Sequence, residues 1–493
     1  MSYEVDRLPA LGIGITYSSA VVPILQKVPE LVDIIEFEPQ TAWIETGRQD
    51  HPYKPIPDIL DYIDAYPSHT LVHGIGTPVG GTVMPELTQI ELLRKVIKRL
   101  NPPWFSDHLS FNQTGQFRTG FFLPPRQTVD GIAMSVRSIK YLQEMLEIPI
   151  AVETGVNYFK PREDELPDGY FVQRVVTEAN CGILLDLHNI LANQINGRQS
   201  VDDFLAMIPK ERVWELHVAG GLEMDGFYLD AHSGAISNLL LDIVREVIPR
   251  LHNLKAIVYE IFPSFVQVAG VDRVTEQLEI LQNLWTNHQR INVDTHNTVA
   301  IIEVNSSHSI GINLSPKEWE DSLGSLVTGQ PPIDEKLIQD LVADPAIKLI
   351  QKLIHEFRAS MIVRTMPYSA RLMMLALGVD IFKAIMQKFW LIHPPHQYAS
   401  TEARAFANFL QDINLRVPQL QKLLEYEVAI INTLIDGQAR VVSFEFNPFP
   451  LLGALSQGRL PDTPSEIGLY EIELTPDTIS QETLNDQQQS PFH

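Results

Sequence analysis

The chain has 493 residues, too many for one ordinary domain. Of these residues, 45% are hydrophobic, which is enough for a sizeable core. Its 61 Asp and Glu against 37 Lys and Arg give a formal net charge of −24, which argues against a nucleic-acid partner bound through phosphates. A single cysteine, Cys181, excludes an intrachain disulfide and a thiolate-ligated zinc or iron–sulfur site. The N-terminus lacks a signal-peptide pattern and no apolar run is long enough to span a bilayer, so we expect a cytoplasmic protein without a membrane partner.

Eight short apolar stretches predict strands, and they begin near residues 11, 33, 70, 104, 148, 181, 213 and 256. Their spacings of 22 to 44 residues are the size of βα units, and segments with helical periodicity, such as 84–100 and 134–147, lie between them. Eight such units in fewer than 300 residues predict an α/β fold, a (β/α)₈ barrel of the triosephosphate isomerase (TIM) type. The active site of such a barrel lies at the carboxyl ends of its strands.

Polar side chains recur where these strands end. In CGILLDLHNI (181–190) an apolar run ends in Asp186 and His188, which point to the same side if the chain stays extended. The loop sequence LDAHSG repeats this spacing with Asp230 and His232. Together, nine imidazole and carboxylate side chains are expected at one barrel mouth: His73, His108, Glu153, Asp186, His188, His217, Asp230, His232 and Glu260.

These nine residues predict a metal centre. Four carboxylates at one mouth would repel one another and raise their own pKa values, and bound cations relieve that conflict. Nine ligands are too many for one ion, so two or three ions are implied, with a carboxylate such as Glu153 bridging them. Imidazole and carboxylate ligation without sulfur suits iron, manganese or zinc, and open positions on iron are the usual arrangement for activating dioxygen.

Other residues near these motifs have supporting interpretations. Asp107, Asn157 and Asn189 are candidates for side chains that hydrogen-bond to the ligands and orient them, and Asp107 is also a candidate ligand. Glu36 and Glu38 either add charge at the mouth or pair with Lys or Arg. The glycines of GIGTPVGG (74–81) lack a phosphate-loop pattern and are interpreted as letting the loop pass close to the site. Five further histidines are assigned to the core or rim: His252, His296, His355, His393 and His396.

Seven motifs in this order resemble the multinuclear non-heme iron-dependent oxidative enzymes, the family of the methanobactin biosynthesis oxidase, over roughly residues 8–290. They are HGIG (73–76), SDHLSF (106–111), VETGVNY (152–158), LLDLHNILAN (184–193), ELHVAGG (215–221), DAHSG (230–234) and YEIFPSF (259–265). The resemblance implies a TIM-type barrel with two or three irons (Fe²⁺/Fe³⁺) held by the nine residues above. It also implies dioxygen as co-substrate and oxidation of a residue, often cysteine, in a ribosomally made precursor peptide.

The expected organisation is a catalytic barrel (1–302), a linker (303–333), a mainly helical domain (334–475) and a polar, disordered tail (476–493). Helical patterns recur at 334–362, 370–389, 401–411 and 416–434, and two strand-like runs follow at 439–446 and 467–474. FANFLQDI (406–413), LLEYEVAIINTL (423–434) and FEFNPFPLLGAL (444–455) resemble the helical partner proteins that hold the precursor peptide in this family. Residues 334–475 are therefore expected to bind a leader peptide, and the alternative is a structural cap or a homodimerisation domain.

Two other functions remain open from the sequence. The first is a divalent-metal-dependent hydrolase or isomerase on a xylose-isomerase-like barrel, although a sugar isomerase would favour a lysine at the metal site and a nuclease would need a basic groove. The second is a metal-dependent scaffold without turnover. Consumption of dioxygen separates the oxidase from both.

Overall fold

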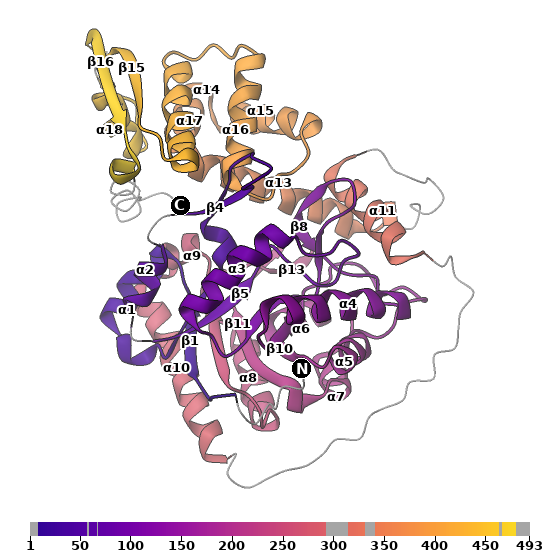
Figure 1. The fold of residues 1–493 in the computed structure, drawn as a ribbon. Helices are drawn as coiled ribbons and strands as arrows, with labels where there is room; N and C mark the ends of the chain where they lie inside the picture. Colours follow the sequence, from indigo (N-terminus) through magenta and orange to yellow (C-terminus); the bar gives the residue numbers. More distant parts are fainter. Residues whose placement is uncertain are drawn as a thin grey trace.

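The structure is a computed structural model that describes residues 8–56, 59–66, 68–291, 314–330, 341–462 and 466–479. Residues 303–313 and 331–333 of the predicted linker, His296 and residues 480–493 of the predicted tail lie outside the described residues. The predicted barrel is confirmed, because eight parallel strands close on one another in the order of the chain (Figure 1). They are β1 (Gly12–Thr16), β2 (Ile34–Phe37), β5 (His69–Gly74), β6 (Phe105–His108), β9 (Ile150–Glu153), β10 (Gly182–Asp186), β11 (Val213–Ala219) and β14 (Ala256–Glu260).

The barrel interior is apolar at one end and polar at the other. Alternate strand residues face inward, so an inward residue near the amino end of a strand is followed two positions later by another, one layer nearer the carboxyl end. Ile34, Leu71, Ala151, Leu184 and Val258 belong to a buried cluster with Trp104 and Trp214. Two residues after each of the first five comes a polar side chain: Glu36, His73, Glu153, Asp186 and Glu260. This period of two places the chemistry at the carboxyl ends of the strands.

Ten helices described by the structure accompany the barrel strands. Apolar residues of strands and helices form the largest core cluster, which includes Leu93, Ile139, Val175, Val244 and Leu278. The helices are α1 (Val22–Lys27), α2 (Ile59–Asp64), α3 (Leu87–Leu100), α4 (Val129–Leu146), α5 (Asp168–Ala179), α6 (Leu187–Ile195), α7 (Val201–Met207), α8 (Asn238–Val247), α9 (Pro263–Ala269) and α10 (Val271–Ile291). Across the described part of the chain, no helix combines the length and apolarity that crossing a membrane requires.

Three hairpins lie in the loops that follow the carboxyl ends of strands. Each pairs two short antiparallel strands, so the loops that surround the barrel mouth are themselves ordered by backbone hydrogen bonds. The pairs are β3 (Trp43–Glu45) with β4 (Tyr53–Pro55), β7 (Phe111–Gln113) with β8 (Arg118–Leu123), and β12 (Gly221–Met224) with β13 (Phe227–Asp230).

The C-terminal region is mainly helical, as predicted. The helices share a core that includes Met373, Phe389, Phe406 and Leu423. Both predicted strands pair antiparallel as β15 (Arg440–Phe446) and β16 (Ile467–Leu474). The helices are α13 (Pro345–Thr365), α14 (Pro367–Leu377), α15 (Val379–Ile392), α16 (Ala399–Asp412), α17 (Leu420–Asp436) and α18 (Phe449–Ser456).

One part of the predicted linker is a helix, α11 (Pro316–Thr328), which corrects the interpretation of that stretch as a connection built from turns. Trp319 and Leu323 of this helix are buried against Phe111, Leu123 and other residues of one cluster. The Trp319 indole N–H donates to the carbonyl of Pro124 at 3.1 Å. Apolar burial and this hydrogen bond attach the helix to the loop region at the barrel mouth.

The helical region lies over the barrel mouth, and β4 and β8 reach it from the barrel side (Figure 1). The Lys54 ammonium donates to the carbonyls of Leu434 and Ile435 at the end of α17, at 2.8 and 3.3 Å. The Thr401 hydroxyl donates to the Glu45 carboxylate at 2.7 Å. Polar contacts to both members of the β3–β4 hairpin therefore join the two regions.

Candidate metal centre

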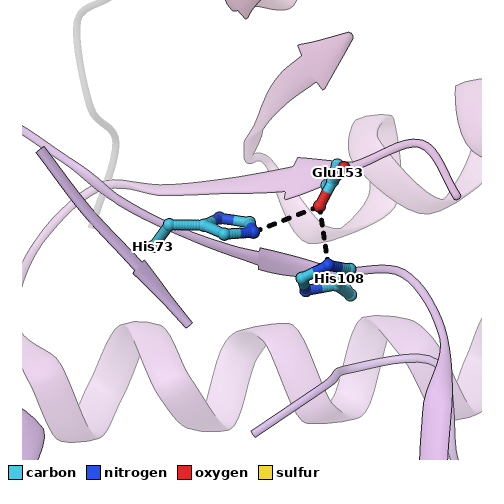
Figure 2. Close-up of side chains that lie close together, drawn as sticks. All are labelled: His73, His108 and Glu153. Atoms are coloured by element: carbon cyan, nitrogen blue, oxygen red, sulfur yellow. Dashed lines mark ion pairs between the residues drawn. The ribbon is translucent and has the colours of Figure 1, made fainter. Parts of the chain in front are cut away.

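The first ligand group combines three neighbouring strands. His73 lies near the carboxyl end of β5, and the last residues of β6 and β9 are His108 and Glu153. His108 and Glu153 are direct register partners. Figure 2 shows both imidazoles pointing at one carboxylate oxygen. The Nε2 atoms of His73 and His108 lie 3.2 and 3.0 Å from Oε2 of Glu153. Together they form a compact three-residue ligand group.

The second group continues from Glu153 around the barrel to Asp186, His217 and Glu260. Asp186 and His217 are register partners on β10 and β11, and Nδ1 of His217 lies 3.2 Å from Oε1 of Glu260. All four residues are buried. Glu153 therefore belongs to both groups.

The third group joins Asp186 to Asp230 and His232 in the loop after β11. Nε2 of His232 lies 2.9 Å from Asp230 and 3.3 Å from Oε2 of Glu260. His232 has a positive φ of 45°, a left-handed conformation that turns its side chain back toward the barrel. Eight of the nine predicted ligands thus lie in three groups linked through Glu153 and Asp186.

His188 is the exception, and the expectation of an extended chain there is wrong. The strand ends at Asp186, whose carboxylate accepts the backbone N–H of Asn189 at 2.9 Å and caps α6. His188 is therefore on a helix. Its Nε2 contacts the Leu229 carbonyl at 3.1 Å and lies 4.0 Å from Asp230, outside the three groups.

Electrostatics link the groups. Burial and the neighbouring carboxylates of Asp230, Glu260 and Glu153 raise the pKa of Asp186 well above its ordinary value. Burial acts to lower the pKa of His232, but Asp230 and Glu260 outweigh it and raise that pKa to about 10. The raised pKa values mean that Asp186 and His232 retain protons, and these protons reduce the repulsion among the neighbouring carboxylates.

The donor atoms fit bound cations better than they fit one another. Glu153 Oε2, Asp230 Oδ1, Glu260 Oε2 and His217 Nδ1 are buried without a hydrogen-bond partner, although other donor or acceptor atoms lie about 3 Å away. Ligands held about 2.1 Å from one ion lie about 3 Å apart without donor–acceptor alignment. The described donor set contains nitrogen and oxygen but no sulfur, which suits iron, manganese or zinc.

The predicted supporting residues divide into two kinds. Asn189 donates from its amide to Asp186 at 3.0 Å, and Asp107 accepts the backbone N–H of His108 at 2.8 Å and the hydroxyl of Thr77 at 2.5 Å. A Cβ at Gly74 would lie 2.3 Å from Asp107, so the glycine permits this close approach. Asn157 instead accepts the backbone N–H of Phe159, and its backbone N–H donates to Asn193.

Two carboxylates complete the surroundings of His217. Glu36, one of the two acids left open above, lies 3.1 Å from Nε2 of His217. Glu215, which was not singled out, lies 3.5 Å from the same atom. The spacing E-L-H (215–217) could have indicated that Glu215 lies beside His217, because on a strand residues two apart face the same side. Glu38 is half-buried, and desolvation raises its pKa.

The centre opens into a cleft of about 1670 Å³ between the barrel mouth and the helical region. His108, Glu153, Asp230, His232 and Glu260 line it on the barrel side. The opposite side is formed by the helical region, with Leu353, Phe357 and Arg364 of α13, Gln397, Tyr398 and Leu434. Asp186 and His217 are fully buried behind this surface.

Comparisons with known proteins address the barrel. The family model described as "RiPP precursor modification enzyme MbnB/TglH/ChrH" matches residues 12–274. A UPF0276 protein of Chromobacterium violaceum is 26% identical over 227 residues, which cover 46% of this chain and 82% of that protein. A UPF0276 protein of Streptomyces avermitilis is 26% identical over 229 residues, 45% of this chain and 47% of that protein.

Solved structures give a more distant likeness. The xylose isomerase domain protein from Planctomyces limnophilus is 13% identical, covers 57% of this chain and 99% of its own, and has a TM-score of 0.38.

Proposed function

This chain belongs to the family of RiPP precursor modification enzymes MbnB/TglH/ChrH, and we propose that it is a multinuclear iron- and dioxygen-dependent oxidase. RiPPs are ribosomally synthesised and post-translationally modified peptides, and the enzymes of this family modify their precursors. Its substrate is a residue, cysteine in the first instance, of a ribosomally synthesised precursor peptide. The observation that carries the proposal is the set of three ligand groups linked by Glu153 and Asp186 at one barrel mouth.

The proposed ligands are His73, His108, Glu153, Asp186, His217, Asp230, His232 and Glu260, with His188 as a ninth candidate that would need its ring to move. Bound iron would supply one-electron chemistry with dioxygen. The protein positions the imidazoles and limits their contact with water: Phe122 stacks on His108 with ring centroids 4.0 Å apart, and Phe262 lies 4.5 Å from His232. These rings place apolar faces directly beside the imidazoles of His108 and His232.

The cleft supports a peptide rather than a small metabolite as substrate. Its volume of about 1670 Å³ exceeds the roughly 300–1,000 Å³ usual for small-molecule sites. No lysine lines it among the described residues, whereas the alternative reaction of a sugar isomerase would favour one at the metal. These features favour the oxidase over a divalent-metal hydrolase or isomerase.

The test is metal analysis of protein from iron-supplemented cells, followed by oxygen uptake after anaerobic mixing with a cysteine-bearing precursor peptide. We expect two or three irons per chain and uptake that depends on the peptide. Stoichiometric zinc that iron cannot functionally replace, with no oxygen uptake, would support the hydrolase instead. Bound metal with neither oxygen uptake nor hydrolysis would support the scaffold.

We further propose that the helical region holds the leader of the precursor peptide over the cleft. Phe357 is 45% exposed on α13 and lines the cleft, so a peptide lying there would cover it. Phe357→Asp should weaken binding of the full precursor about tenfold or more, because it places a charge against the buried peptide.

The matched control is Leu391→Asp on α15, at a side chain that is 80% exposed and not part of the cleft lining. Fluorescence anisotropy with labelled full precursor and labelled leader alone measures both affinities. Unchanged affinity for both peptides in Phe357→Asp would favour a structural cap or a homodimerisation domain, and light scattering would then identify a dimer.

A further inference from the structure

Glu36 and Glu215 are buried acids with no Lys or Arg beside them. Both are 0% exposed inside the barrel, and among the described residues neither forms an ion pair with Lys or Arg. Placing an ionised carboxylate in such surroundings is costly unless a specific partner holds it. Their shared partner is the imidazole of His217.

Each acid is fixed at one oxygen and directs the other toward that imidazole. The Trp104 indole N–H donates to Oε2 of Glu215 at 2.8 Å, and the Thr16 hydroxyl donates to Oε1 of Glu36 at 3.3 Å. The second oxygens, Oε2 of Glu36 and Oε1 of Glu215, lie 3.1 and 3.5 Å from Nε2 of His217. The two acids therefore approach one ring nitrogen from β2 and β11.

The other nitrogen of His217 faces the second ligand group. Nδ1 lies 3.2 Å from Oε1 of Glu260 and has no hydrogen-bond partner. A neutral imidazole carries one N–H, so donation from Nε2 to a carboxylate leaves the lone pair on Nδ1. A carboxylate on the far nitrogen is the common way in which proteins orient a ligand histidine and increase its basicity.

We propose that Glu36 and Glu215 are positioning residues that hold His217 with Nδ1 directed at the ion shared with Glu153, Asp186 and Glu260. This inference rests on the proposed metal centre but not on its reaction. Glu36 is the main acceptor because it is nearer to Nε2, and Glu215 limits rotation of the ring from the second side.

The competing interpretation is that Glu36, Glu215 and Nε2 of His217 bind an ion of their own, because these atoms also form a compact group. The two interpretations differ in stoichiometry and in the effect of amides. Glutamine keeps an oxygen that accepts the N–H of His217 but removes the charge.

The experiment compares Glu36→Gln, Glu215→Gln and the double variant with wild-type protein, using anaerobic Fe²⁺ titration against a chelator and Mössbauer spectroscopy of the ⁵⁷Fe-loaded protein. We expect each single variant to keep the full metal stoichiometry. The double variant should bind one iron about 10–100-fold more weakly, with an altered quadrupole splitting for that iron only. Thermal denaturation of the metal-free forms checks that each variant is folded.

Glu427→Gln is the matched control, since it neutralises a buried carboxylate in the helical region that has no contact with the ligand groups. Its iron affinity and spectrum should equal those of wild type. The inference is overturned if the double variant binds iron with wild-type affinity and spectrum, or if Glu36→Gln alone removes one whole ion. Failure of the proposed function looks different, because oxygen uptake would then be absent in wild type while the iron affinities still differed as expected.

Discussion

Glu153 is the residue on which two ligand groups depend. Its Oε2 lies close to both His73 and His108, and the same side chain belongs to the group of Asp186, His217 and Glu260. Glu153→Ala should therefore reduce iron content in two groups at once. His73→Ala should reduce it in only one, since His73 belongs to one group.

Iron per chain, measured by plasma mass spectrometry after desalting, distinguishes these outcomes. His51→Ala is the control, because the His51 side chain is 81% exposed and lies outside the groups. Equal losses in Glu153→Ala and His73→Ala would show that Glu153 does not bridge.

Protonation of His232 predicts a dependence of metal binding on pH. In the metal-free protein the raised pKa of about 10 means that the ring is protonated at neutral pH. Binding a metal must release that proton, so affinity should rise with pH and proton release should be detectable with an indicator dye.

The same shift sets the sign for stability. A histidine pKa raised from 6.5 to about 10 gives stabilisation that is complete below pH 6.5 and is lost as pH rises through 10. The melting temperature of chelator-treated protein should therefore fall over this range, while added iron should increasingly restore it. A metal-free melting temperature that rises from pH 6.5 to 10 would contradict the assignment.

Eight of the nine side chains selected by residue spacing lie in the three ligand groups, and the failure at His188 has a local cause. The i, i+2 rule holds for Glu215 and His217 because both lie on β11. It fails for Asp186 and His188 because Asp186 is the last residue of β10 and the N-cap of α6. The rule requires knowing where the strand ends, and the capping role of Asp186 determines that end.

At the scale of elements, the eight strands were predictable because runs buried on both faces are apolar and then end in polar residues. Helix α11 was missed because its surroundings are rich in turn-forming residues. Yet SPKE (315–318) is a capping box: Ser315 caps the helix, Pro316 begins it, and Glu318 bonds back to the Ser315 backbone. Such local capping patterns indicate helices whose apolar periodicity is too short to be conclusive.

Another element-scale feature gives a prediction for α14. Glu427 on α17 accepts the backbone N–H groups of Tyr368 and Ser369 in the first turn of α14, at 2.7 and 3.0 Å. This is an N-terminal cap supplied by a neighbouring helix. Burial raises the pKa of Glu427 to about 7, so its ionisation destabilises the fold as pH rises from 4.5 to 7.

Glu427→Gln removes this titration. The melting temperature of the variant relative to wild type should therefore increase between pH 5 and pH 8, by the equivalent of at most about 3 kcal/mol. Circular dichroism melts at the two pH values measure the difference. If the difference between variant and wild type does not change with pH, the Glu427 carboxyl has no raised pKa.

At the scale of the whole molecule, the arrangement of the two regions could not be deduced from residue patterns, because it depends on contacts between distant segments. One such contact is Lys54 at the carboxyl end of α17, where a cation is favoured by the helix dipole and satisfies terminal carbonyls. Lys54→Met keeps an unbranched apolar side chain and removes the charge and both hydrogen bonds. The helical region, which forms the roof of the cleft, should then separate from the barrel more often.

Hydrogen exchange should accordingly quicken at residues 43–55 and 434–437 in Lys54→Met, and the precursor peptide should show a higher KM with unchanged iron content. The metal ligands are not altered, so a change limited to KM identifies the roof as part of the peptide site. Lys422→Met is the control, since Lys422 lies on the same helix but pairs only with Glu425 among the described ion pairs. Unchanged exchange in Lys54→Met would instead assign the docking of the two regions to the buried contacts of Trp319 and its neighbours in α11 and α13.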